Sequence, residues 1–305
     1  MIELQTLSSP PRYLMAQGQT IIDPSNTARL ASYIARNSQK VARPFRSLWS
    51  SMAEFLTPAE AKRAIRIGGM PPEWQKEFER AIREFVLEDV ARIQTAIFSE
   101  VGKDVARRVN ALPRKDFAFN ATRQRVQQRI ETHGAELVTR SVEAQILALR
   151  AALLEYVVTE AMTPFTLAKK LRLFIGLTER YSRAVLRLER DLVMEGLAPN
   201  MVASQVERYA AFLHKVRAEN IARTELSFGY NFGQLEAINQ ASESGWLLGE
   251  VFKKWNTTGQ SGRVCEDCEA LDGEEVRQEE VFSAGVEAPP LHPQCGCGLS
   301  YETRR

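Results

Sequence analysis

The stretch Cys265-Glu-Asp-Cys268, followed by His292-Pro-Gln-Cys295-Gly-Cys297, decides how the C-terminal part of this chain folds. All four cysteines of the 305 residues lie in these two motifs. A Cys-x-x-Cys pair directs two thiolates at one ion, and the second motif offers donors that complete a tetrahedron. The sequence therefore predicts a zinc site. Its candidate ligands are Cys265, Cys268, His292, Cys295 and Cys297.

Five donors compete for four coordination positions. We predict the set Cys265, Cys268, Cys295 and Cys297, because all-thiolate sets are common in closed sites and Gly296 permits a tight Cys-x-Cys turn. A set in which His292 replaces one cysteine of the second motif stays open. Since a closed site leaves no position for water, the predicted role of the zinc ion is structural.

Two disulfides, four unligated thiols and a hydrolytic zinc site are the alternatives. Disulfides need an oxidising compartment. The chain opens Met-Ile-Glu-Leu-Gln, without the basic and apolar regions of a signal peptide, so we expect reduced thiols. A hydrolytic site would need a metal-bound water and a base near His292. The carboxylates considered for that base are Asp267, Asp272 and Glu274.

Charge is unevenly distributed, although the net charge is only +2. Residues 1–50 carry six Lys and Arg against two acidic residues, a net charge of +4. Residues 250–305 carry six basic against eleven acidic residues, a net charge of −5, which disfavours phosphate binding by the zinc segment. The basic segment mixes charge with aromatic residues and is the candidate partner-binding or DNA-binding surface. Its residues are Arg36, Lys40, Arg43 and Arg46.

Apolar periodicity predicts a mainly α-helical protein whose long amphipathic helices precede a small α+β zinc-binding module. Helices are expected to start after Thr57 and Thr163, each followed by proline, and after Asn200. Alternation in 246–255 predicts a hairpin. The expected domains are an extended basic arm (1–50), a helical body (51–245) and the zinc module (246–305).

No hydrolase, P-loop or dinucleotide motif occurs in the chain, so we predict that the protein is not an enzyme. His133 and His214 lie in predicted helices without a neighbouring nucleophile. The longest apolar stretch, 146–158, contains Arg150 and Glu155 and falls short of the roughly 20 residues of a membrane span. Neither a membrane segment nor a small-molecule substrate is expected.

Several motifs occur together in a characteristic order. They are Ile221-Ala-Arg-Thr-Glu225, Lys254-Trp255, Cys265-Glu-Asp-Cys268, Leu271-Asp-Gly273, Phe282 and Pro289-Pro-Leu-His-Pro-Gln-Cys-Gly-Cys297. In this order the chain resembles the phage head morphogenesis family, the minor head proteins of Mu-like and related tailed phages, over roughly residues 165–300. The chain has Gly296 where these proteins typically carry arginine.

The resemblance implies a structural and assembly protein of the virion head. Its expected partners are portal and capsid proteins, and its expected location is the head interior or portal vertex, after assembly in the host cytoplasm. One alternative is a packaging factor that contacts DNA through the basic N-terminal arm. A zinc-dependent hydrolase is the other alternative.

Overall fold

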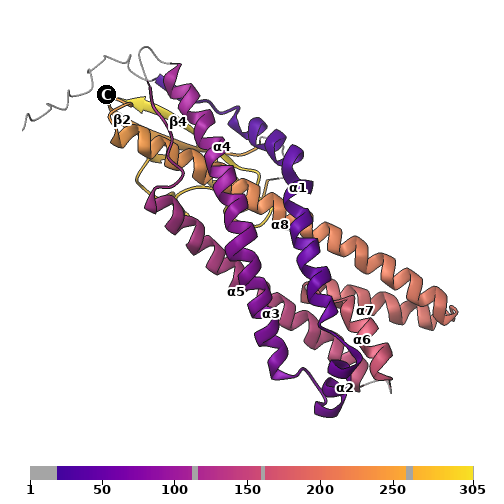
Figure 1. Ribbon diagram of the computed structural model, residues 1–305. Coiled ribbons are helices and arrows are strands. Elements are labelled where there is room, and N and C mark those ends of the chain that lie inside the picture. Colours follow the sequence, from indigo (N-terminus) through magenta and orange to yellow (C-terminus); the bar gives the residue numbers. More distant parts are fainter. Residues whose placement is uncertain (1–18, 112–115, 159–161, 259–263, 305) are drawn as a thin grey trace, which may run out of the picture. The chain divides into compact units, whose positions relative to one another are not determined.

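The computed structural model describes residues 19–111, 116–158, 162–258 and 264–304 (Figure 1). It is mainly α-helical with a small antiparallel sheet, which confirms the predicted fold class. The helices are α1 (Asn26–Glu54), α2 (Pro58–Ile67), α3 (Pro72–Phe85), the π-helical turn η1 (Val86–Val90), α4 (Ala91–Asn110), α5 (Gln124–Val158), α6 (Pro164–Arg172), α7 (Glu179–Met194), α8 (Pro199–Glu243) and α9 (Glu266–Leu271). The strands are β1 (Gln19–Ile22), β2 (Glu250–Asn256), β3 (Glu275–Arg277) and β4 (Gly298–Arg304).

Threonine caps define the starts of three helices. The Thr57 hydroxyl accepts a hydrogen bond from the Glu60 backbone N–H at 3.3 Å, so α2 begins where the sequence predicts. Thr163 caps α6 in the same way, through the backbone N–H of Thr166 at 3.2 Å. Thr178 caps α7. Each cap satisfies a donor that the first helical turn leaves without an intrahelical partner.

The chain divides into two compact units. Unit 1 comprises Met1–Ala35, Ala96–Val126 and Thr224–Arg305, and unit 2 comprises Arg36–Thr95 and Gln127–Arg223. The boundaries fall inside α1, α4, α5 and α8. The compact units therefore differ from the predicted domains, because a helix of several turns can contribute one end to each of two cores.

The sheet of unit 1 has the strand order β1-β4-β2-β3, with every neighbouring pair antiparallel. The central strand β4 pairs with β2 over its whole length, from Gly298 opposite Asn256 to Arg304 opposite Glu250. β1 comes from the N-terminal region and completes the edge, pairing Gln19 with Thr303. The strands lie beside the C-terminal half of α8, drawn in orange (Figure 1).

Asn26 connects three segments of unit 1 from a fully buried position. Its side-chain amide donates to the Leu299 carbonyl in β4 and to Gln234 Oε1 in α8, both at 2.8 Å. Its oxygen accepts from the Tyr230 hydroxyl at 2.9 Å and from Gln234 Nε2 at 3.0 Å. Buried polar groups need such partners, so Asn26 fixes the start of α1 against the sheet and α8.

Three sequence predictions differ from the structure. Residues 26–50, predicted as part of an extended arm, form most of α1, while residues 1–18 lie outside the described residues. Asn200 lies inside α8 rather than capping it, because the helix begins at Pro199, which suits the first turn. Residues 246–249 form no strand, since β2 finds its partners in β3 and β4.

Gly176 in unit 2 allows a close approach of backbone to an aromatic ring. It adopts a left-handed conformation with φ of 85°, and a Cβ atom there would lie 2.4 Å from the Trp49 ring. Its N–H donates to Gln145 Oε1 at 2.6 Å. Any larger residue must therefore displace a buried indole as well as adopt a strained backbone.

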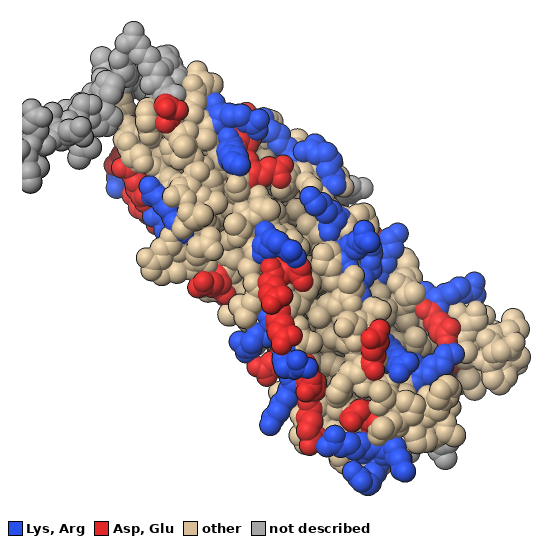
Figure 2. Space-filling view, in the orientation of Figure 1, with Lys and Arg blue, Asp and Glu red and all other residues tan. Residues whose placement is uncertain are grey.

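No helix within the described ranges is both long enough and apolar enough to cross a membrane. This agrees with the sequence of the apolar stretch 146–158, in which Arg150 is exposed. On the face shown in Figure 2, acidic and basic side chains lie among uncharged residues, which cover most of the described surface.

We predict that Gly176→Ala lowers the free energy of unfolding by about 3 kcal/mol, the sum of the left-handed backbone and the clash with Trp49. Gly196→Ala is the matched control, because Gly196 has a similar φ of 77° and nothing within 4 Å of a built Cβ. Gly196→Ala should lower the free energy of unfolding by only about 1 kcal/mol. Urea denaturation measures both, and equal losses would contradict the packing argument.

Candidate metal centre

Two loops of unit 1 supply the five candidate ligands. Cys265 stands at the N-cap of α9, where its sulfur accepts from the Cys268 backbone N–H at 3.4 Å. Cys268 lies in the first turn of the same helix, so the Cys-x-x-Cys spacing places both sulfurs at one helix end. The second loop turns at Gln294, a residue with φ of 64°, and the Cys295 N–H donates to the His292 carbonyl at 3.1 Å.

The donor atoms converge in two triads that share Cys268. One triad is Cys265, Cys268 and His292, and the other is Cys268, Cys295 and Cys297, with ligand atoms within 4.8 Å of one another in each. His292 Nε2 lies 3.1 Å from Cys265 Sγ and 3.3 Å from Cys268 Sγ. Cys268 Sγ lies 3.7 Å from Cys295 Sγ. A zinc tetrahedron with ligands at about 2.0–2.3 Å has edges of about 3.3–3.8 Å, and the three separations lie within or about 0.2 Å below this range, so the donor set fits a tetrahedral ion of this size.

The tautomer of His292 suits metal binding. Its Nδ1 lies 2.9 Å from the Pro293 carbonyl oxygen, which can only accept, so Nδ1 carries the proton. In the neutral ring Nε2 then has a free lone pair facing the two sulfurs. A backbone carbonyl that orients a ligating imidazole is a usual outer partner of metal sites.

Thiol electrostatics favour a cation at this position. Burial, together with the charge of Cys295, raises the pKa of Cys268 above its usual range. A hydrogen bond from Cys297 lowers the pKa of Cys295 to about 5. The same hydrogen bond and burial raise the pKa of Cys297. The negative charge of the Cys295 thiolate thus disfavours ionisation of Cys268 and Cys297. A divalent cation would offset this repulsion.

Helix α8 holds the second loop from behind. Thr224 Oγ1 accepts from the Gln294 N–H at 3.0 Å, and Asn231 Nδ2 donates to the Cys297 carbonyl at 3.2 Å. Sequence reasoning used the Ile221–Glu225 motif only for the family resemblance and missed Asn231. The Ile221–Glu225 motif could have indicated the contact of Thr224, whereas no local pattern marks Asn231.

Three of the candidate ligands belong to a hydrophobic cluster. Cys268, Cys295 and Cys297 are buried in it, with Trp255 and Phe282 packed edge to face at a ring distance of 5.2 Å. Cys265 is exposed and His292 half-buried, so the metal centre lies at the edge of this cluster.

The carboxylates considered as hydrolytic bases have other partners, apart from the exposed Asp267. Asp272 Oδ1 accepts from the Thr257 N–H at 2.8 Å. Glu274 accepts from the N–H and the hydroxyl of Ser283, both at 2.7 Å. These bonds hold loops together and do not bring the acids to His292.

The matched family covers most of the helices α6 to α8 and the metal centre. Residues 166–300, somewhat under half of the chain, match the family model described as Phage Mu protein F like protein. This segment is Mu protein F-like. The match confirms the resemblance to the phage head morphogenesis family that the sequence motifs indicate over this segment. No curated protein and no solved structure matched the chain.

We predict that a strong chelator unfolds the metal-centre loops and β2–β4 while helical signal from unit 2 persists. Structural zinc contributes on the order of 10 kcal/mol, comparable to the stability of a domain. Hydrogen exchange read by mass spectrometry should show new exchange in 250–304. The same chelator preloaded with zinc is the control, and unchanged protection after metal removal would refute a structural role.

Proposed function

We propose that this Mu protein F-like protein is a minor head protein, a structural and assembly component that binds portal and capsid proteins at the head interior and is not an enzyme. The observation that carries the proposal is that the family match includes all five Cys and His donors. Zinc would hold the C-terminal loops in the shape that a partner binds. Such a role needs no catalytic residue.

We propose that the ligands are Cys265, Cys268, His292 and Cys295. His292 Nε2 lies close to the sulfurs of Cys265 and Cys268, and the Cys268 sulfur lies close to that of Cys295. These three contacts connect the four residues. Cys297 would then remain outside the first coordination shell and donate its thiol hydrogen bond to Cys295. Four protein ligands close the coordination sphere, which supports a structural metal over a hydrolytic one.

X-ray absorption at the zinc edge tests this ligand set. We expect one zinc per chain with three sulfur neighbours and one nitrogen neighbour. Cys297→Ser should keep the metal, whereas Cys268→Ser should lose it, because Cys268 belongs to both triads. Four sulfur neighbours, together with zinc retained in His292→Ala, would instead establish the all-thiolate set. A metal-bound water would favour the alternative of a zinc-dependent hydrolase.

Binding to the portal is tested with the portal protein from the same phage. We expect co-sedimentation that falls little as salt rises, because the core of a protein interface is largely apolar. Cys268→Ser should weaken it if the zinc module forms part of the contact. If the portal sediments and this protein stays in the supernatant at every salt concentration, the proposed association is contradicted.

DNA contact through α1 is the second candidate. Arg36, Lys40 and Arg43 are exposed at steps of four and three residues, so they share one face of the helix, and Arg46 follows half-buried. Among the described residues no ion pair involves these four side chains. Figure 2 shows Lys and Arg along the edge that α1 follows. This arrangement supports contact with a phosphate backbone.

We predict that Lys40→Glu/Arg43→Glu weakens the binding of duplex DNA. The slope of log K against log salt concentration should decrease by about the amount that two phosphate contacts contribute. Lys62→Glu/Arg66→Glu in α2 makes the same charge change at exposed positions and should have a smaller effect. Fluorescence anisotropy at several salt concentrations measures both variants. Equal affinities for all three proteins would exclude α1 as the DNA surface.

A further inference from the structure

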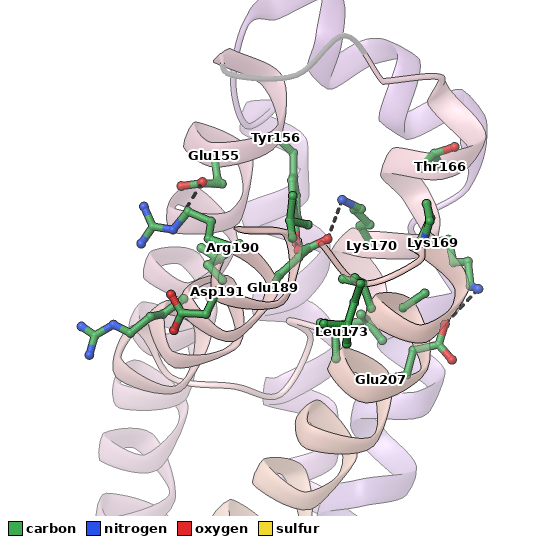
Figure 3. Close-up of a pocket in the computed structure, with 18 of the residues that line it drawn as sticks. Glu155, Tyr156, Thr166, Lys169, Lys170, Leu173, Glu189, Arg190, Asp191 and Glu207 are labelled. Atoms are coloured by element: carbon green, nitrogen blue, oxygen red, sulfur yellow. Dashed lines mark hydrogen bonds and ion pairs between the residues drawn. The ribbon is translucent and has the colours of Figure 1, made fainter. Parts of the chain in front are cut away.

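A hollow opens in unit 2 between the end of α5, the helices α6 and α7, and the beginning of α8 (Figure 3). Its volume is about 930 Å³. Apolar side chains from several helices line it, including Leu173, Leu186, Val202 and Val206. Val193 and Met194 also line it and are 61% and 77% exposed. Large apolar side chains left open around a hollow indicate an interaction site.

Ion pairs surround this apolar surface. Lys170 pairs with Glu189 at 2.7 Å, Lys169 with Glu207 at 2.9 Å and Arg190 with Glu155 at 3.9 Å (Figure 3). The charges of these side chains are thus already compensated. Because Lys169, Lys170 and Arg190 are each paired with a carboxylate, this part of the surface attracts a phosphate backbone only weakly, which disfavours nucleic acid as the occupant.

A second hollow adjoins the first along α7. It has a volume of about 760 Å³ and shares Arg187 and Asp191 with the first hollow. Arg180, Arg183 and Arg187 line it at steps of three and four residues, so they share one face of α7. Arg183 pairs with Glu179 at 2.5 Å. No ion pair is found for Arg180 or Arg187 within the part of the chain that the structure describes.

The occupant must therefore combine an apolar surface with negative charge. An amphipathic helix places apolar side chains at i, i+3, i+4 and i+7 and fits a groove between helices. Carboxylates at the same spacing beyond the apolar part would meet the arginines of α7, whose planar guanidinium groups bind carboxylates through two hydrogen bonds. We propose that the two hollows along α7 bind an acidic amphipathic helix of a partner protein.

A displayed library of helical peptides tests the proposal without knowledge of the natural partner. Peptides of about 18 residues span about 27 Å, which is longer than α7 at 1.5 Å per residue. Selection against the full-length protein should enrich sequences with an apolar stripe and an acidic end. Enrichment of no sequence, or of sequences without these two features, would overturn the proposal.

Variants then locate the binding site. Arg180→Glu/Arg187→Glu should lower the affinity for an enriched peptide roughly tenfold or more, and Met194→Asp should lower it to the same extent. The matched controls are Lys62→Glu/Arg66→Glu, with the same charge change, and Met201→Asp, at a methionine that is 52% exposed outside both hollows. The controls should change affinity less than threefold. Equal effects of variants and controls would place the peptide elsewhere.

Two competing occupants give distinct results. A single-stranded oligonucleotide that displaces the peptide, with affinity dependent on Arg180 and Arg187, would assign the surface to nucleic acid and overturn the proposal. A dimer in solution that Met194→Asp converts to monomer would assign it to a second copy of the chain, with the same consequence. Neither result is expected, and neither depends on the zinc site.

Discussion

The grouping of three buried thiols, one of which also contacts the His292 imidazole, is the constraint on which the C-terminal structure depends. Cys268, Cys295 and Cys297 lie in a hydrophobic cluster, where separate negative charges would be costly. A divalent cation would bind the two loops and neutralise that charge together. Between the two loops β3 has only three residues, so a cation would add to the hydrogen bonds and apolar contacts that hold these loops.

The metal centre is also coupled to the long helices of unit 1. Thr224 and Asn231 of α8 hold the second loop, while Asn26 connects the start of α1 to β4. A change at the candidate metal centre would therefore reach α8. The predicted zinc module thus shares one hydrophobic cluster with residues of α4 and α8 in unit 1, which explains why the predicted boundary near residue 245 is not a boundary between units.

The hollows along α7 are a second surface with different chemistry. They combine apolar side chains with arginines in unit 2, whereas the metal centre combines sulfur and imidazole in unit 1. The family match includes residues of both. The two surfaces share no residue, so substitutions can be made at one without changing the side chains of the other.

The sequence by itself determined the helical class, the capped starts at Thr57 and Thr163 and the five metal donors, because caps, periodicity and Cys spacing are local properties. Only the tertiary structure decided that residues 19–22 join the C-terminal sheet and that α8 continues to Glu243. It also decided that His292 faces Cys265 and Cys268. These features depend on contacts between residues far apart in the chain, about which local patterns carry no information.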